Sequence, residues 1–304
     1  MTADPNRAEM AISALLTAPA PLADAPPVQR TVEVVGARPV DAYVELRLAA
    51  PEIAERAQPG QFVAFAVGGE TSGLLLRRSI AISTAEDGVV TVVVSAAGPG
   101  STWLTERRPG DTVDVVGPLG RPFPMPPPGT RALLVGGGYG AAALVGLAAQ
   151  LKAAGHEVVA VAGAAAADRL CSVQELTGLV DTLAVTTDDG SAGRRGLVTL
   201  AVDELLAGSG MVYACGPMRM LQAVADAASA QGIPSYVAVE EAMACGIGVC
   251  MTCVLPVIGE DGLSRLSRSC TEGPVFGGDR VRFDDVGTLP WDVVGADAMG
   301  VTRP

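Results

Sequence analysis

The stretch EEAMACGIGVCMTCVLPVIGEDGLSRLSRSCTEGPVF, residues 240–276, holds four of the six cysteines of the chain. They follow the spacing C-x4-C-x2-C, and sixteen residues separate the third cysteine from the fourth. This is the plant-type spacing of the four thiolates that hold a [2Fe–2S] cluster. Glycines at 246 and 248 suit a loop bent closely around such a cluster. The predicted metal ligands are Cys245, Cys250, Cys253 and Cys270.

A structural zinc site is the alternative for these thiols, because Zn²⁺ also takes four cysteine ligands. Zinc ligands usually come as two short pairs, whereas here three cysteines gather and the fourth stands apart. The spacing therefore favours the iron–sulfur cluster and leaves zinc as the second interpretation.

Composition excludes several classes of function. The chain has 304 residues, enough for two domains and a small third, and a formal net charge of −12. A field of that sign repels phosphate backbones, so nucleic acid is not an expected partner. No apolar run reaches the roughly 20 residues that span a bilayer, so no membrane partner is expected. Cysteines gathered in one metal-like segment favour a reducing cytoplasm over a disulfide scaffold.

Patterning predicts a β-barrel plus α/β architecture. Residues 1–28, rich in Ala and Pro, are expected to form a disordered tail. Short β-branched runs separated by turns predict a small antiparallel barrel or sandwich over 29–127, and the family resemblance described below implies the barrel. Strands then alternate with helices, which predicts a parallel sheet over 128–238. The cysteine-rich segment leaves a small C-terminal domain over 239–304.

Two glycine turns follow apolar strands in the α/β half. GGGYG, residues 136–140, precedes a predicted helix over 141–154, and such a turn lets a diphosphate approach the backbone. ACGPMRM places Cys215 at the carboxyl end of a second strand, where open α/β sheets bind ligands. A tight βα turn and a buried apolar cysteine are the alternatives. The lone His156 has no evident catalytic partner and is expected at the surface.

The barrel half holds two candidate anion sites. LLRRSIAIS places Arg77 and Arg78 at the start of an apolar strand, where an arginine can bind a flavin diphosphate or ring oxygen. GPGSTWL, residues 98–104, opens a short helix with free N–H groups. The alternatives are a solvated charge and an ordinary turn. No Ser–His–Asp set or P-loop is present, so cofactors are expected to carry the chemistry and no catalytic side chain is predicted.

Four motifs in order, LLVGGGYG, TTDDGSAGRRGLVT, YACGPMRM and MACGIGVCMTCV with its later SCTEGPVF, together resemble one family. It is the electron-transfer subunit of NAD-linked, two-subunit dihydroorotate dehydrogenases, within the ferredoxin–NADP reductase superfamily. The resemblance covers about Thr31 to Val281. It implies a flavin-binding barrel, an NAD-binding α/β domain and a small [2Fe–2S] domain, with FAD, the cluster and NAD(H) as cofactors.

Carried over residue by residue, the resemblance places the cofactors on named positions. The R-P-[LIV]-S flavin motif falls on Arg78, Ser79, Ile80 and Ala81. Pro and Ser of that motif are replaced here by Ser79 and Ala81, which removes a hydroxyl. The next flavin strand falls on Val93, Val94 and Ser95, and G-x-G-T on Gly98, Gly100 and Ser101. The nucleotide turns supply Gly136, Gly137, Gly138, Gly140, Cys215, Gly216 and Pro217.

The resemblance implies that the protein passes electrons between NAD and the FMN of a separate catalytic subunit in pyrimidine (UMP) biosynthesis. A heterotetramer with two copies of each subunit is expected. One alternative is a reductase subunit for another partner, of the hydrogenase or glutamate synthase type. A second is a non-enzymatic, metal-binding regulatory protein, which the altered flavin motif would allow.

Overall fold

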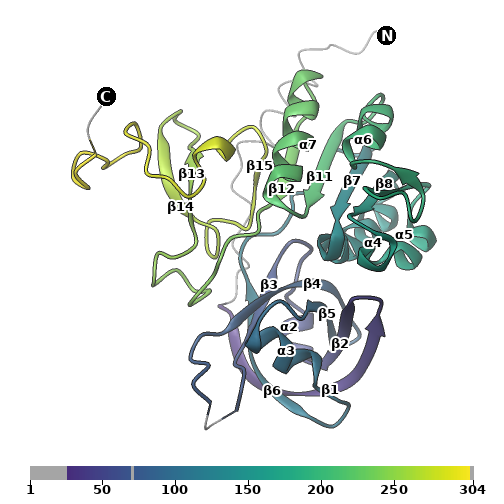
Figure 1. Cartoon of the computed structure of the whole chain (residues 1–304), viewed down its shortest axis with the longest axis vertical. Coiled ribbons are helices and arrows are strands. Elements are labelled where there is room, and N and C mark those ends of the chain that lie inside the picture. The colour runs from purple at the N-terminus through teal and green to yellow at the C-terminus, as the bar shows by residue number, and fades with distance from the viewer. Residues whose placement is uncertain (1–25, 70–71, 302–304) are drawn as a thin grey trace.

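The computed structural model of the chain describes residues 26–69 and 72–301 (Figure 1). The predicted disordered tail, residues 1–28, lies outside the described residues except for its last three positions. Of these three, Val28 already begins the first strand. Figure 1 shows a barrel, a sheet with helices beside it, and a C-terminal part alongside both.

The first part is a closed barrel of six antiparallel strands in the order β1-β2-β5-β4-β3-β6. Alternating apolar residues of these strands fill its interior, among them Leu46, Val92 and Val115, each fully buried. Two short helices, α2 (Pro51–Ala54) and α3 (Pro99–Thr105), lie in its connections. The strands are β1 (Val28–Val40), β2 (Tyr43–Ala49), β3 (Phe62–Phe65), β4 (Arg78–Glu86), β5 (Val89–Ser95) and β6 (Thr112–Leu119).

The second part is a seven-stranded sheet in the order β10-β9-β8-β7-β11-β12-β15. All neighbours are parallel except β15, which runs antiparallel to β12. The strands are β7 (Arg131–Gly137), β8 (Glu157–Ala164), β9 (Thr182–Thr187), β10 (Arg194–Arg195), β11 (Met211–Cys215), β12 (Ser235–Ala238) and β15 (Val275–Gly277). The helical elements are η1 (Gly138–Leu144), α4 (Val145–Ala153), η2 (Ala167–Arg169), α5 (Val173–Leu179), α6 (Thr199–Leu205) and α7 (Met218–Ala230).

Both faces of this sheet are covered, because its central strands β7, β8 and β11 are apolar after the charged residues Arg131 and Glu157 that begin β7 and β8. Leu134 of β7 faces the core formed with α4 and α5, whereas its neighbour Leu133 faces the core formed with α6 and α7. This two-sided burial is typical of parallel sheets. The predicted combination of an antiparallel barrel with a parallel α/β sheet is confirmed.

One local prediction in this part is confirmed only in part, and one is wrong. The helix expected over 141–154 begins as the 3₁₀ segment η1 and becomes α-helical only at Val145. The turn is tight, since a Cβ built on Gly136 would lie 2.6 Å from Ala141 Cα. His156 is not at the surface: it is 5% exposed. Its Nδ1 lies 3.0 Å from the carbonyl oxygen of Thr130, so it is a satisfied core residue.

The C-terminal part contains the hairpin β13 (Val254–Ile258) and β14 (Ser264–Arg268), with η3 (Phe283–Asp285) after it. Between hairpin and η3 the chain returns to the sheet as β15. The predicted 128–238 and 239–304 domains therefore share one sheet, and the domain limits remain predictions. None of the helices in the described ranges is long and apolar enough to span a bilayer.

Candidate functional site

The hairpin β13–β14 brings two of the predicted metal ligands together. Cys253 precedes β13 and Cys270 follows β14, and the N–H of Ser269 donates to the Cys253 carbonyl at 2.9 Å. Both thiols are buried, with 1% exposure for each residue. Burial and the neighbouring Cys253 thiol raise the pKa of Cys270 to about 12. A group that compensates the thiolate charge is therefore needed to ionise Cys270.

The other two ligands lie on the loop before β13, residues 242–253, which we call the cluster loop. Three backbone N–H groups point at the sulfur of Cys245, those of Ile247, Val249 and Cys250, at 3.4 to 3.5 Å. Gly246 and Gly248 hold left-handed conformations, with φ of 72° and 83°, that turn the loop around this sulfur. Backbone donors of this kind stabilise a thiolate.

Cys250 is the exposed member of the set. Hydrogen bonds from Thr252, and then from Cys245, lower the pKa of Cys250 to about 6. No three Cys, His, Asp or Glu side chains within 26–69 and 72–301 gather as ligands of one metal ion. A binuclear cluster does not need that arrangement, because each iron takes two thiolates. Four thiols on one loop and hairpin, with N–H donors around them, fit such a cluster.

Arg78 and the glycine turn before α3 come together in the barrel, as predicted for a flavin site. A Cβ built on Gly100 would collide with the Arg78 guanidinium and lie 2.7 Å from its Cζ. Arg78 Nη1 donates to the carbonyl oxygen of Leu76 at 2.6 Å, and none of the ion pairs among the described residues includes Arg78. Its positive charge therefore stands beside the first turn of α3 without an acidic partner.

The Ser101 hydroxyl is hydrogen-bonded to the backbone of its own turn. It accepts the N–H groups of Ala97 and Gly98 at 3.0 Å each and donates to the Gly98 carbonyl. This hydroxyl fixes the shape of the turn, so what the turn offers a ligand is its backbone. The Arg77 guanidinium also has partners within the protein: it forms an ion pair with Asp114 and donates a hydrogen bond to the Ala64 carbonyl.

The two predicted flavin strands differ in what they expose. On β4, Ser79 and Ile80 are half-buried and Ala81 is exposed. On β5, Val94 is fully buried in the barrel core, so only its backbone can face a ligand. Its neighbour Val93 points to the other side and packs in the core of the sheet, and Ser95 is half-buried.

The seven predicted nucleotide residues meet at one edge of the sheet. Cys215 at the end of β11 pairs with Gly136 at the end of β7. A Cβ on Gly140 would lie 2.6 Å from the Cys215 carbonyl oxygen, and one on Gly137 would lie 2.9 Å from Pro217 Cδ. A Cβ on Gly216 would in turn lie 3.0 Å from the backbone of Gly137. The two turns therefore form one glycine-lined surface at the carboxyl ends of parallel strands, where α/β folds bind nucleotides.

Two aromatic residues of this edge escaped the sequence prediction. Tyr43 of β2 lies 3.6 Å from the position that a Cβ on Gly138 would take, and its ring centroid is 6.0 Å from that of Tyr139. Its hydroxyl donates to the Arg169 carbonyl at 2.9 Å, which ties the barrel to the loop after β8. Tyr139 stands within the GGGYG motif, whereas nothing near Tyr43 in the sequence signals this contact.

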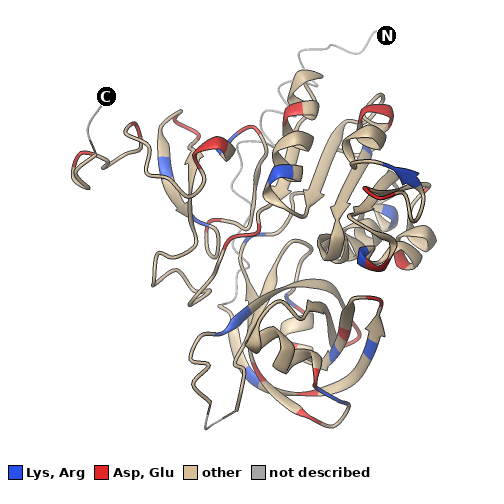
Figure 2. Cartoon of the chain, viewed as in Figure 1, with Lys and Arg blue, Asp and Glu red and all other residues tan. Residues whose placement is uncertain are grey.

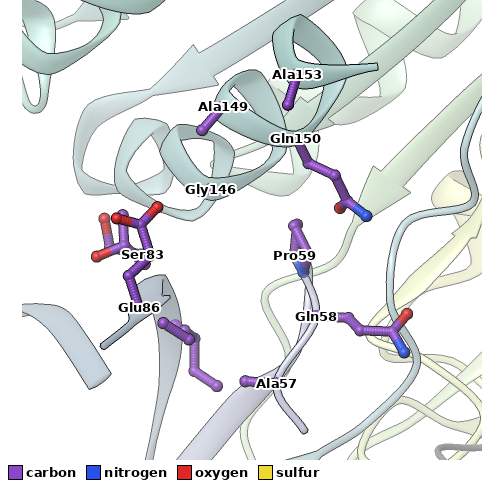
Figure 3. Close-up of a pocket in the computed structure, with 12 residues that line it drawn as sticks. Ala57, Gln58, Pro59, Ser83, Glu86, Gly146, Ala149, Gln150 and Ala153 are labelled. Carbon is purple, nitrogen blue, oxygen red and sulfur yellow. The ribbon is translucent and has the colours of Figure 1, made fainter. Parts of the chain in front are cut away.

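A separate cavity lies between the barrel and α4. Ser83 and Glu86 of β4 line it from one side, and Gly146 and Gln150 of α4 from the other (Figure 3). None of the predicted cofactor residues lines it. It is therefore distinct from the flavin, nucleotide and cysteine groupings.

The cluster loop and the predicted flavin strand are in contact. A Cβ on Gly246 would lie 3.4 Å from Ser79 Oγ and 3.6 Å from Ala64 Cβ. Beneath this contact, Cys253 and Cys270 pack with residues of β3 and of the end of β6, namely Phe62, Ala64 and Leu119. The barrel and the C-terminal part thus share a small apolar core directly under the cysteines.

One segment of the chain matches a known protein family, and most of the chain is similar to named relatives. Residues 240–282 match the model of the iron–sulfur cluster binding domain of dihydroorotate dehydrogenase B. The chain is 39% identical over 236 residues to the dihydroorotate dehydrogenase B (NAD(+)) electron transfer subunit of Geobacillus thermodenitrificans, which covers 76% of this chain and 90% of the relative. It is 40% identical over 235 residues to the subunit of the same name in Bacillus caldolyticus, with the same two coverages.

A solved structure is similar over most of the chain. It is that of an NADH-dependent reduced ferredoxin-NADP oxidoreductase, described for flavin-based electron bifurcation. The TM-score is 0.74 at 33% identity, with 84% of this chain and 91% of the other covered.

Proposed function

The chain belongs to the family of dihydroorotate dehydrogenase B electron-transfer subunits, and we propose that it carries electrons between NAD and the FMN of a separate catalytic subunit. Membership confirms the predicted class, an NAD-dependent flavin and iron–sulfur oxidoreductase subunit of pyrimidine biosynthesis. It also confirms FAD, a [2Fe–2S] cluster and NAD(H) as the cofactor set. FAD, when bound, exchanges a hydride with NAD(H) and single electrons with the cluster.

We assign the cluster to Cys245, Cys250, Cys253 and Cys270. Two of these thiols are buried and paired by the hairpin, and two lie on a loop whose N–H groups point at sulfur. The left-handed conformations of Gly246 and Gly248 hold these donors around the sulfur.

We assign FAD to the barrel edge formed by Arg78, Ser79, Ile80 and Ala81 with Val93 to Ser95, Gly100 and Ser101. The guanidinium of Arg78, which has no acidic partner among the described residues, stands beside the turn at Gly100 and supports binding of an anionic diphosphate. The backbone and Ser79 must supply the hydrogen bonds, because Ala81 has no hydroxyl.

We assign NAD(H) to the joined turns at Gly136–Gly140 and Cys215–Pro217. Their side-chain-free surface lets a diphosphate approach the backbone. Burial raises the pKa of Cys215 to about 12, so its thiol stays neutral and places no charge beside a hydride donor.

The contact between Gly246 and Ser79 carries the proposal. It joins the cluster loop to the predicted flavin strand without any intervening segment. Because single-electron transfer needs the two redox groups close together, this contact supports a direct path from one site to the other.

The partner is proposed to be an FMN-containing catalytic subunit in a heterotetramer with two copies of each chain, acting in the cytoplasm. The cluster loop exposes Ile247, Val249 and Met251, at 52%, 75% and 51%. No charged residue occurs between Glu241 and Glu260, and Figure 2 shows the loop uncoloured. An exposed apolar surface next to the cysteines fits a protein interface. Val249→Asp should weaken capture of the catalytic subunit, whereas Leu200→Asp on α6 should not.

The direct test of function is reconstitution. The purified chain and the FMN-containing catalytic subunit, mixed without oxygen, should reduce NAD⁺ when dihydroorotate is added. Neither protein alone should do so. A mixture in which the catalytic subunit oxidises dihydroorotate while NAD⁺ stays unreduced would contradict the proposal.

A second candidate partner is another redox protein. The likeness to the ferredoxin-NADP oxidoreductase structure favours it, because that protein has a similar chain in a different enzyme. Isolation of the native complex separates the two: a companion that binds FMN and oxidises dihydroorotate supports the first, and one that uses ferredoxin supports the second.

A further inference from the structure

One buried hydroxyl beside the cysteines has no hydrogen-bond partner. Over residues 26–69 and 72–301, the buried side-chain oxygens without such a partner are those of Asp114, Thr186 and Thr271. The Asp114 oxygen does have a partner of another kind, because it forms an ion pair with Arg77. Thr271 directly follows the ligand Cys270, and its Oγ1 is the orphaned atom.

The Thr271 side chain lies against the cluster loop. A Cβ built on Gly248 would stand 2.8 Å from Thr271 Cγ2 and 3.4 Å from its Oγ1. Gly248 is midway between Cys245 and Cys250. The Gly248 carbonyl is held by Arg268 Nη1 at 3.0 Å. Loop and hydroxyl are thus fixed relative to each other.

The usual local acceptor for this hydroxyl is taken. Threonine hydroxyls commonly bond a carbonyl three or four residues earlier. Here the carbonyl of Arg268 already accepts the N–H groups of Thr271 and Glu272, at 3.2 and 2.8 Å. Native proteins seldom leave a buried hydroxyl without a partner, so an acceptor supplied by a bound group is expected.

We propose that the Thr271 hydroxyl donates a hydrogen bond to a sulfur of the bound cluster and thereby raises its reduction potential. The inference rests on the proposed assignment of the cluster to the four cysteines. Reduction adds one electron and no proton, so the reduced cluster is more negative than the oxidised one. A donor to sulfur therefore stabilises the reduced form more.

The test is a potentiometric titration of the cluster, followed by electron paramagnetic resonance, in the full chain loaded with FAD and cluster. Thr271→Val keeps the shape and removes the donor, and Thr271→Ser keeps the donor. Thr186→Val is the matched control, since it removes the other orphaned hydroxyl in the NAD-binding sheet. We expect Thr271→Val to lower the reduction equilibrium constant about tenfold, which is about 59 mV for one electron. Thr271→Ser and Thr186→Val should match the wild type.

An unchanged potential in Thr271→Val, with the cluster present, would overturn the inference and leave the proposed function intact. Absence of a [2Fe–2S] signal from the wild-type chain would instead overturn the cluster assignment itself. If Thr271→Val retains no cluster, Thr271→Ala is titrated in its place, with the same lowering expected. Loss of the cluster from both variants, with the fold retained, would make Thr271 a packing residue and also overturn the inference.

Discussion

Gly246 of the cluster loop faces Ser79 of β4, so that a Cβ on the glycine would lie 3.4 Å from the serine hydroxyl oxygen. The two residues lie far apart in the sequence, one in the cysteine motif and one in the altered flavin motif. Their contact joins the barrel directly to the C-terminal part.

Cys250→Ser should remove the cluster and leave flavin reduction by NADH intact. Cys250 is the exposed member of the four proposed ligands and belongs to neither the proposed flavin site nor the proposed nucleotide site. Iron and sulfide analysis should show loss of the cluster, while anaerobic NADH still bleaches the flavin at close to the wild-type rate. Loss of bleaching would contradict separate sites for NADH oxidation and the cluster.

Arg78→Ala should release FAD selectively. The substitution removes the unpaired guanidinium beside Gly100, and a hydrogen bond to a charged group contributes about 1.5–3 kcal/mol. FAD affinity should therefore fall about tenfold or more while the iron content is unchanged. Arg30→Ala is the control, because Arg30 pairs with Glu52 on the barrel surface. Unchanged flavin content in Arg78→Ala would refute the placement of FAD.

Gly140→Ala should weaken NADH binding. The new methyl group would lie 2.6 Å from the Cys215 carbonyl oxygen and push the two nucleotide turns apart. Overpacking of this kind costs about 1–3 kcal/mol, so a KM for NADH about tenfold higher is expected, with FAD and iron retained. Gly178→Ala on α5, where a Cβ meets nothing within 4 Å, should leave KM unchanged. Equal KM values for both variants would argue against a nucleotide site at these turns.

Glu241→Gln should stabilise the protein only above acidic pH. Burial raises the pKa of Glu241, so the folded state binds its proton more tightly than the unfolded state. The contribution of Glu241 to the free energy of unfolding is therefore greatest below its pKa in the unfolded state. This contribution is lost as pH rises through its raised pKa in the folded state. Thermal unfolding should show a Tm about 1–2 °C higher for the variant at pH 8 and no difference near pH 3.5. An equal gain at both pH values would point to a packing effect.

Much of the site could be predicted from the sequence because its residues are close along the chain. The cysteine spacing, the GGGYG turn and the ACGP turn each depend on local backbone chemistry. Their meeting at the ends of β7 and β11 follows from the general rule for parallel sheets.

The contacts that join the three parts could not be predicted. β15 is only three residues long, Val275–Gly277, and carries no periodicity that marks it as a strand beside β12. Tyr43 reaches Gly138 across a barrel–sheet boundary. His156 is buried because it bonds the Thr130 carbonyl, a partner 26 residues away. Each depends on packing between distant segments.

The most direct test of the central claim is the cofactor content of the anaerobically purified chain. The account predicts two irons, two sulfides and one FAD per chain, no zinc, and a flavin that anaerobic NADH bleaches. Zinc at the cysteines, or iron without flavin, would contradict it and favour a regulatory metal-binding protein.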